Sequence, residues 1–105
     1  MTAWKATSGC QVSTPSTGAS FALDYRVPRF IKGDFAPGGT VDIGFKDQEL
    51  ETAFAKSLGV PVLLANVSQQ VYQMARAAGL NKQEGSAVVK VYEAMTGIRV
   101  GNAPE

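Results

Sequence analysis

The sequence predicts an all-α fold, a compact bundle of about four to five helices, and three observations support this prediction. Apolar residues recur at steps of three and four over each long segment, which is the spacing of one helix face. Glycine and proline residues stand between these segments, where they end one helix or begin the next. The connections are short, which favours antiparallel neighbours. The 105 residues suffice for one domain with a modest core.

Both ends of the chain are expected to lie outside this bundle. Residues 1–15 are rich in Ser, Thr and Gly and show no apolar period, so we expect a flexible arm or leader there. Residues 98–105 are expected to form a frayed tail. The helical domain is therefore predicted to span residues 16–97.

The first helical segment covers residues 19–32. It begins with a helix-like apolar pattern. Pro28 is expected to interrupt this helix, because a proline inside a helix removes a hydrogen bond and clashes with the preceding turn. A loop is predicted to follow over residues 33–39.

A long helix is predicted from about residue 40 to residue 58. Thr40 follows a Pro-Gly-Gly turn and is a good N-cap, so the helix begins there. Gly59 is the usual left-handed residue after a helix end. One stripe of this helix is expected to be buried, and its members are Ile43, Asp47, Leu50, Phe54 and Leu58.

Two charged residues on this helix are candidate site residues. Asp47 lies within the stripe that is expected to be buried, where a carboxylate costs several kcal/mol unless it is paired or hydrogen-bonded. We therefore expect Asp47 to have a structural role. Lys46 lies about 100° round the helix from Asp47 and points off the stripe. Two interpretations of Lys46 stay open, a binding residue or a solvated surface lysine.

The next helix is predicted over residues 60–78, with Pro61 in its first turn and Gly79 at its end. Its apolar residues recur at alternating steps of four and three, as in a heptad seam. This seam exceeds what one small core consumes, so it is a candidate subunit interface. Its members are Val60, Leu64, Val67, Val71, Met74 and Ala78.

The last predicted helix begins at Glu84 or Ser86 and ends at Gly97. Its β-branched residues make it the least typical helix of the chain, because branched side chains lose rotamer freedom in a helix. These residues are Val88, Val89 and Val91.

Composition argues against several classes of function. The net charge of +1 predicts neither nucleic acid nor an anionic membrane as a partner. The chain has no histidine, which removes histidine-based catalysis and imidazole metal sites, so we expect no metal site. Cys10 is the single cysteine, which fits a reducing cytoplasm. No apolar run approaches the about 20 residues of a membrane span, so a soluble protein is expected.

The segment over residues 34–50, DFAPGGTVDIGFKDQEL, carries a resemblance to a known family. Its order, D-F-x-P-G and then K-D at the start of a long helix, resembles the C-terminal domain of the β-hydroxyacid dehydrogenases. These include 3-hydroxyisobutyrate dehydrogenase and tartronate semialdehyde reductase. Further motifs resemble the same family and extend the resemblance over about residues 16–97: Ser16 to Ser20 (STGAS), Leu58 to Val62 (LGVPV), and Tyr72, Ala75 and Gly79 followed by Glu84-Gly85-Ser86.

The resemblance implies the all-α C-terminal domain of 6-phosphogluconate dehydrogenase-like enzymes. It implies a homodimer, and NAD or NADP as the cofactor of the whole enzyme. It also implies that Lys46 faces the cofactor or substrate across the cleft between two domains. The sequence departs from the family pattern at Gly39, Gln48 and Glu84, which stand where the family has an apolar residue, a leucine and an aspartate.

The cofactor-binding half of such an enzyme is expected to be missing. The family binds NAD(P) at a G-x-G-x-x-G turn between a strand and a helix, and the sequence has no such turn. The lysine-bearing motif of the family's interdomain helix is missing too. We therefore expect no catalytic residue and no bound cofactor in the isolated chain, and we expect it to need a Rossmann domain in cis or in trans.

Two hypotheses follow for the function. In the first, the chain is the helical domain of a 3-hydroxyisobutyrate dehydrogenase-like enzyme, supplies one wall of the cleft and the dimer interface, and is inactive alone. In the second, it is a stand-alone helical module for oligomerisation or protein binding, derived from such a domain.

Overall fold

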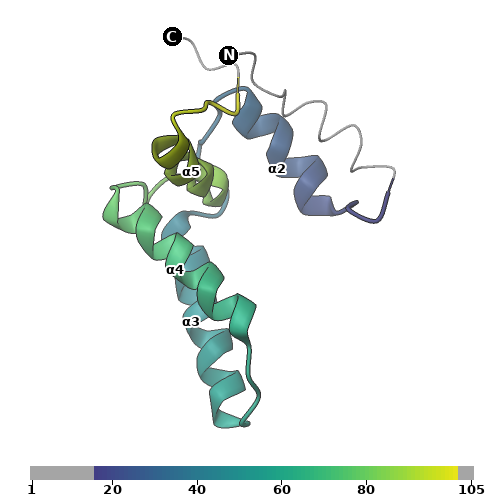
Figure 1. The fold of residues 1–105 in the computed structure, drawn as a ribbon, viewed down its shortest axis with the longest axis vertical. Helices are drawn as coiled ribbons and strands as arrows, with labels where there is room; N and C mark the ends of the chain where they lie inside the picture. Colours follow the sequence, from purple (N-terminus) through teal and green to yellow (C-terminus); the bar gives the residue numbers. More distant parts are fainter. Residues whose placement is uncertain (1–15, 102–105) are drawn as a thin grey trace. The chain divides into compact units, whose positions relative to one another are not determined.

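The computed structural model describes residues 16–101, and this part of the chain is helical (Figure 1). The described residues hold no β-strand, only an isolated bridge between Thr40 and Glu84. The predicted all-α class is therefore confirmed. The chain divides into two compact units, one spanning Ala36–Val91 and the other combining the residues up to Phe35 with those from Tyr92 onward. The helices are α2 (Phe21–Ile31), α3 (Val41–Ser57), α4 (Leu63–Ala77), the 3₁₀ helix η1 (Gly85–Val88) and α5 (Val89–Thr96).

Helix α2 runs through Pro28, so the prediction that this proline interrupts the helix is wrong. Ser20 caps the helix, because its Oγ accepts the backbone N–H of Leu23 at 3.0 Å. Pro28 cannot donate to the carbonyl four residues earlier, but the bonds at both ends of the helix are present, from the N–H of Asp24 to the carbonyl of Ser20 and from the N–H of Lys32 to the carbonyl of Pro28. A ladder of side chains also spans the proline, since Tyr25 stacks on Phe21 and the guanidinium of Arg29 lies 4.2 Å from the centre of the Tyr25 ring.

The start of the predicted tail is held in place. The backbone N–H of Val100 donates to the carboxylate of Glu93 at 2.8 Å. A Cβ on Gly101 would lie 2.5 Å from the carbonyl oxygen of Ile31, so only glycine fits there without a shift. Residues 98–101 are therefore an ordered extension within their unit. The segment 1–15, expected to be an arm, lies outside the described residues.

Helix α3 has the predicted ends. The Oγ1 of Thr40 accepts the N–H of Ile43 at 3.2 Å, and the helix stops before Gly59, whose φ of +73° is the left-handed conformation that glycine adopts without strain. Gly79 follows α4 with a φ of +82° and ends that helix in the same way. Both glycine assignments are confirmed.

Pro61 does not lie in the first turn of α4, so that prediction is wrong. Helix α4 begins at Leu63, and Val62 precedes it with a φ of −128° and a ψ of 69°, outside the helical region. The N–H of Val60 turns back to the carbonyl of Ala55 at 2.9 Å, which closes α3. A proline disfavours helical geometry at the residue before it. Pro61 therefore helps to keep the residues between the two helices out of the helical region.

The last predicted helix is present, but its first turn is tighter than expected. Glu84 caps η1, which continues directly into α5, and Gly97 ends α5 with a φ of +72°. The tight turn puts Gly85, Ser86 and Ala87 in the interior.

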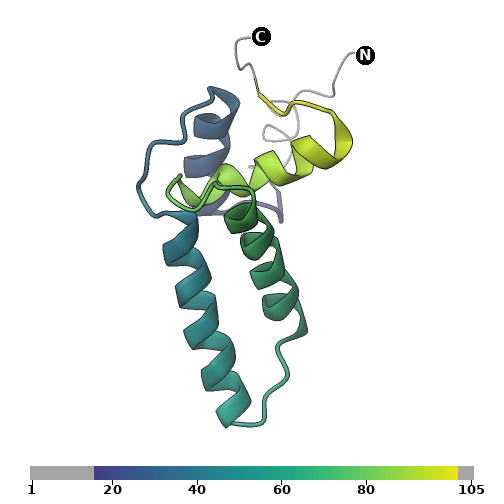
Figure 2. The ribbon, with the colours of Figure 1, turned by 90° about the vertical axis from the view of Figure 1, so that its left-hand side faces the viewer.

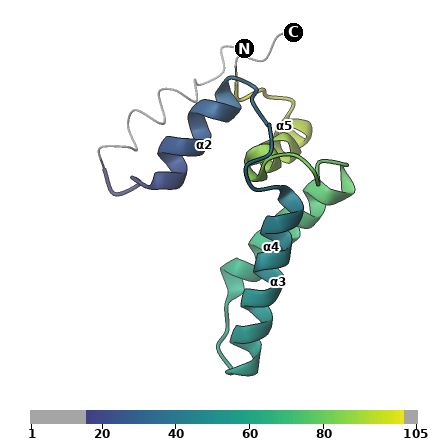
Figure 3. The same ribbon diagram turned by 180° about the vertical axis from the view of Figure 1, so that it is seen from behind.

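Helices α3 and α4 lie side by side as an antiparallel pair, as Figure 2, turned by 90° from Figure 1, and Figure 3, seen from behind, both show. Their shared face is made of small and polar side chains. Gly44 lies against the ring of Tyr72, Gln48 donates to Ser68 at 2.9 Å, and Gln69 donates to Glu49 at 2.7 Å. The fully buried apolar residues of this unit gather where the N-terminus of α3, the end of α4 and η1 meet: Val41, Ala75 and Ala87.

The apolar stripe of α3 that was expected to be buried is exposed, so that prediction is wrong. Its apolar members are 48 to 67% exposed, and Asp47 is exposed as well. The physical reason is the face that α3 turns to α4: small residues such as Gly44 allow the close approach, which directs the larger side chains outward. We call the residues on the far side the outer face of α3: Ile43, Lys46, Asp47, Leu50 and Phe54.

In helix α4, too, the apolar side of the helix is exposed and does not face its neighbour. The predicted heptad seam points away from α3, and most of it is exposed in the chain. We call this side the outer face of α4: Leu63, Leu64, Val67, Val71 and Met74. Val71 is half-buried and the other four are exposed, with Leu64 at 85% and Val67 at 63%. The pair is thus polar between its helices and apolar on its outside.

Candidate functional site

The N-terminus of α3 is closed by the loop that follows α4. The N–H of Val41 donates to the carbonyl of Gln83 at 2.9 Å, and the N–H of Asp42 donates to the carbonyl of Asn81 at 3.1 Å. The side-chain hydroxyl of Thr40 accepts a hydrogen bond from the N–H of Ile43. Free N–H groups at a helix start are what binds anions. Because the chain itself satisfies these N–H groups, this helix start offers no phosphate site.

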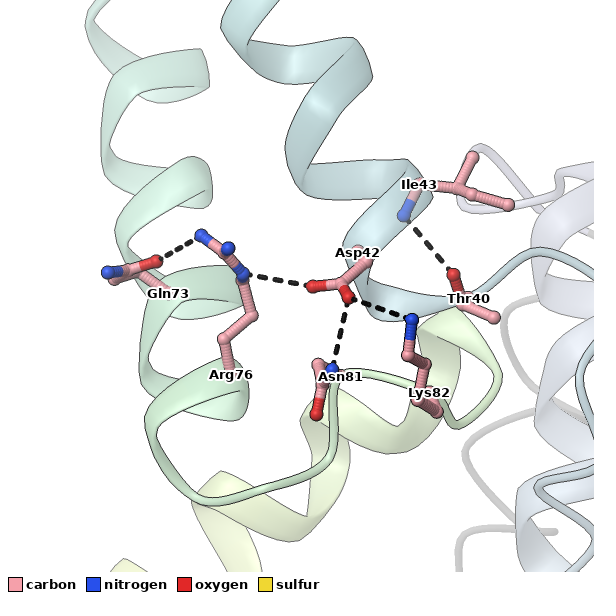
Figure 4. A network of polar contacts seen from close by, with 7 residues as sticks. All are labelled: Thr40, Asp42, Ile43, Gln73, Arg76, Asn81 and Lys82. Atoms are coloured by element: carbon pink, nitrogen blue, oxygen red, sulfur yellow. Dashed lines mark hydrogen bonds and ion pairs between the residues drawn. The ribbon is translucent and has the colours of Figure 1, made fainter.

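A polar cluster around Asp42 fastens this junction (Figure 4). The carboxylate accepts Nε of Arg76 at 3.0 Å and Nδ2 of Asn81 at 3.1 Å, and Nζ of Lys82 lies 3.8 Å away. Gln73 orients the guanidinium by accepting its Nη1 at 2.8 Å. The cluster borders an open hollow of about 370 Å³ on the surface. Asp42 thereby joins α3 to α4 and to the loop after α4.

Phe45 adds an aromatic contact to this cluster. The guanidinium of Arg76 lies 4.2 Å from the centre of the Phe45 ring, a cation–π contact. Arg76 therefore contacts both Asp42 in the first turn of α3 and Phe45 at the start of the second. This contact fixes the start of the helix that carries Lys46.

The hydrogen bond from Asn81 lowers the pKa of Asp42 below its ordinary value of 3.8, and the bond and charge of Arg76 and the charge of Lys82 add to this effect. Burial of the carboxyl acts in the opposite direction. Asp42 therefore stays ionised and paired at neutral pH. A carboxylate in this state fastens structure and is a poor general base.

We expect the Asp42 cluster to make the fold sensitive to acid. A carboxylate whose pKa is lower in the folded state stabilises the fold fully above its unfolded pKa of about 3.9, and this stabilisation is lost as pH falls through the folded pKa. Thermal melts of the wild type and Asp42→Asn between pH 2 and pH 6 measure it. The variant should have the lower Tm at pH 6, and the difference should shrink below pH 3. A difference that stays constant over this range would contradict the assignment.

Lys46 and Asp47 lie together on the outer face of α3, and both are exposed. Asp47 therefore carries no desolvation cost in this chain, and the argument for a buried, hydrogen-bonded carboxylate does not apply. Lys46 stands one turn after Asp42, and residues four apart lie on the same side of a helix. Its ammonium group is free to meet an anion beyond this helix, next to the exposed side chains of Ile43 and Leu50.

A third site is the buried carboxylate of Glu84, which is 3% exposed. It accepts the backbone N–H of Ser86 at 2.8 Å and the hydroxyl of the same residue. The N–H of Gly85 donates to the carbonyl of Gly39 at 2.7 Å, which ties the start of η1 to the residue before Thr40. The acidic-x-Ser motif is thus a structural cap that holds two distant loops together.

The other predicted structural residues lie at the far end of the α3–α4 pair. Gly59 and Pro61 line a second open hollow of about 280 Å³ together with Thr52, Lys56 and Asn66. Gly79 lies at the opposite end, between α4 and the loop that holds Asn81. The structure therefore groups Lys46 with Asp47 and separates both from Gly59 and Pro61.

The cluster of Asp42, Arg76 and Asn81 is not among the features that the sequence predicted. Its one local signal is the position of Asp42 in the first turn of α3, where acidic residues are common. The partners are 34 and 39 residues away in the sequence, so no spacing rule connects them.

Two kinds of feature are absent from the part of the chain that the structure describes. Residues 16–101 contain no group of three His, Cys, Asp or Glu side chains able to hold a metal ion. In the same range, no helix is long and apolar enough to cross a membrane.

Comparison with known proteins gives a consistent result. The family described as "NAD-binding of NADP-dependent 3-hydroxyisobutyrate dehydrogenase" matches residues 5–92, which begins within the segment predicted as an arm. The chain is 38% identical over 86 residues to 2-(hydroxymethyl)glutarate dehydrogenase of Eubacterium barkeri, covering 81% of this chain and 29% of that protein. It is 34% identical over 85 residues to L-threonate dehydrogenase of Escherichia coli K12, covering 81% and 28%.

A solved structure agrees with these matches. The crystal structure of 3-hydroxyisobutyrate dehydrogenase from Salmonella typhimurium superimposes with a TM-score of 0.78 at 32% identity, over 82% of this chain and 30% of that one. The chain therefore spans less than a third of the length of the relatives that it matches.

Proposed function

The chain belongs to the family of NADP-dependent 3-hydroxyisobutyrate dehydrogenases, within the β-hydroxyacid dehydrogenases, and on this premise we propose that it serves as the helical C-terminal domain of an NAD(P)-dependent hydroxyacid oxidoreductase. In this role it supplies one wall of the active-site cleft and a subunit interface. A Rossmann domain, in cis or in trans, supplies the pyrophosphate site. The single cysteine fits a cytoplasmic location.

The observation that carries this proposal is the outer face of α3. It combines exposed apolar side chains with two charged residues, Lys46 and Asp47, and the residues of the Asp42 cluster hold the start of the same helix in place. Apolar surface with a few polar or charged groups is typical of a cleft wall that contacts a cofactor or substrate. Lys46 is the residue that would meet the phosphate or carboxylate of the bound molecule.

The isolated chain is expected not to bind the cofactor. Micromolar affinity needs about 8 kcal/mol. One exposed lysine paired with a phosphate contributes about 1 kcal/mol or less, and the N–H groups at the start of α3 are already used within the chain. Titration calorimetry of this chain with NADPH should therefore show no micromolar binding. Binding at that level would mean that no second domain is required for the cofactor.

We expect Lys46 to contribute to turnover once a cofactor-binding domain is present. The test is a chimera in which this chain replaces the matching segment of the E. coli L-threonate dehydrogenase. Loss of a hydrogen bond to a charged group costs about 1.5–3 kcal/mol, so Lys46→Ala should lower kcat/KM about 10- to 100-fold. Lys56→Ala is the matched control, because Lys56 is exposed on the same helix. Equal activities of the two variants would refute a binding role for Lys46.

A second candidate function is a stand-alone helical module for oligomerisation or protein binding. The exposed apolar residues on both outer faces favour it, since these surfaces are large for a chain of this size. The two candidates differ in one property. A chimera with cofactor-dependent activity supports the enzyme domain, whereas a stable assembly of this chain with no activity in any chimera supports the module.

A further inference from the structure

Arg76 of α4 contacts two consecutive turns of α3 with one side chain (Figure 4). Its Nε donates to the carboxylate of Asp42 at 3.0 Å, and its guanidinium lies 4.2 Å from the centre of the Phe45 ring. Gln73 accepts Nη1 of the same guanidinium at 2.8 Å. A planar group that is bonded at two edges and stacked on one face has little freedom to turn. Arg76 therefore restricts how the start of α3 moves relative to α4.

Lys46 is adjacent to both residues that Arg76 contacts. Phe45 precedes it in the sequence, and Asp42 lies one turn earlier on the same side of the helix. Within an α-helix the N–H of residue 46 donates to the carbonyl of residue 42. A movement of Asp42 or Phe45 therefore moves the backbone of Lys46 as well.

The packing of α3 on α4 leaves rotation of α3 about its own axis for other contacts to resist. At this level the contact is Gly44 against the ring of Tyr72, and glycine has no side chain that could interlock with the neighbouring helix. Side chains reach about 5–6 Å from a helix axis, so a rotation of about 10° moves them by about 1 Å. A misplacement of about 1 Å can cost an enzyme up to about 100-fold in rate.

The contacts of Arg76 are well placed to prevent this rotation. The backbone bonds of Val41 and Asp42 to the loop after α4 act close to the helix axis, within about 2.3 Å of it. The contacts of Arg76 with the Asp42 carboxylate and the Phe45 ring act farther from the axis, where a given force resists rotation more strongly. They also lie on the side of α3 on which Lys46 follows.

We propose that Arg76 is a positioning residue for Lys46, and that it sets the place of the Lys46 ammonium group in the cleft by holding Asp42 and Phe45. This inference rests on the proposed function, in which Lys46 meets the phosphate or carboxylate of the bound molecule. Arg76 acts through Lys46 and makes no contact of its own with that molecule.

The first test is a double-mutant cycle in the chimera with the E. coli L-threonate dehydrogenase. Arg76→Lys keeps the positive charge beside Asp42 but lacks the planar group that stacks on Phe45. It should lower kcat/KM about 3- to 10-fold when Lys46 is present and less than about two-fold in the Lys46→Ala background, because residues that act as a unit are not additive. All assays are run well below the Tm of each variant, so that every protein is folded.

Lys82→Ala is the matched control for the loss of a cation beside Asp42. Its ammonium group lies 3.8 Å from the same carboxylate, and its side chain is 85% exposed. Exposed ion pairs contribute little, so this variant should change kcat/KM by less than about two-fold.

The second test needs no activity and uses the 105-residue chain itself. Amide hydrogen exchange followed by NMR reports how often each helical hydrogen bond opens. Arg76→Lys should lower the protection of the amides of Phe45, Lys46 and Asp47 at least about 10-fold. The amides of residues 54–57, at the other end of α3, should keep their protection, which separates local loosening from a loss of overall stability.

The two tests separate this inference from the proposed function. A loss of kcat/KM that is equal with and without Lys46, or no loss in Arg76→Lys, would overturn the inference. Unchanged protection of the three amides would overturn it too, whatever the chimera does. An inactive chimera together with reduced protection would overturn the proposed function alone. If Arg76→Lys loses helix content by circular dichroism, Phe45→Leu replaces it under the same criteria, because it removes the ring and keeps the bond to Asp42.

Discussion

Replacing Gly44 by valine is expected to destabilise the protein by about 2–3 kcal/mol, the upper range for adding methyl groups to a close-packed contact. A Cβ at this position would lie 2.6 Å from Cε1 of Tyr72 and 3.2 and 3.3 Å from two further ring atoms. The three atoms lie along one edge of the ring, so the Tyr72 ring has to move away or the two helices have to separate. Separation of α3 and α4 would weaken the bonds of Gln48 and Gln69.

Helix propensity does not offset this loss. Valine is better than glycine inside a helix by only a few tenths of a kcal/mol. Denaturant unfolding of Gly44→Val against the wild type measures the difference. Ala53→Val is the control, because Ala53 is exposed on the same helix and should lose less than about 0.7 kcal/mol. If both variants lost the same free energy of unfolding, the contact of Gly44 with Tyr72 would not explain the destabilisation.

Replacing Glu84 by alanine is expected to lower the free energy of unfolding by on the order of 2–3 kcal/mol. The side chain is almost fully buried and accepts both the N–H and the hydroxyl of Ser86. Its removal leaves two donors of a buried residue without their partner. It also removes the cap of η1 and frees the loop whose carbonyls hold the start of α3.

The matched experiment uses three variants in thermal and denaturant unfolding. Glu84→Gln keeps an acceptor for the N–H of Ser86 and should lose less than Glu84→Ala. Glu51→Ala removes an exposed carboxylate of α3 and should change stability by less than about 0.5 kcal/mol. If Glu84→Ala matched Glu51→Ala, the buried bonds of Glu84 would contribute nothing net to stability.

Local features of the sequence predicted the helix ends well. Thr40, Gly59, Gly79 and Gly97 stand where the structure begins or ends a helix, because caps and left-handed glycines act through neighbouring backbone atoms. The two wrong predictions of helix ends both concern proline residues. Proline disfavours the interior of a helix, but α2 continues through Pro28. Pro61 suits the first turn of a helix, but the loop after α3 moves the start of α4 to Leu63.

By itself the sequence determined the all-α class, the family, and the presence of an apolar face on α3 and on α4. Only the tertiary structure decided which faces meet. Periodicity reports that one side of a helix is apolar, but it does not report what covers that side. The close approach of Gly44 to Tyr72 and the long-range bonds of Asp42 to Arg76 and Asn81 select the small, polar sides for the contact between α3 and α4. Lys46 and the outer face of α4 are left exposed for partners as a result.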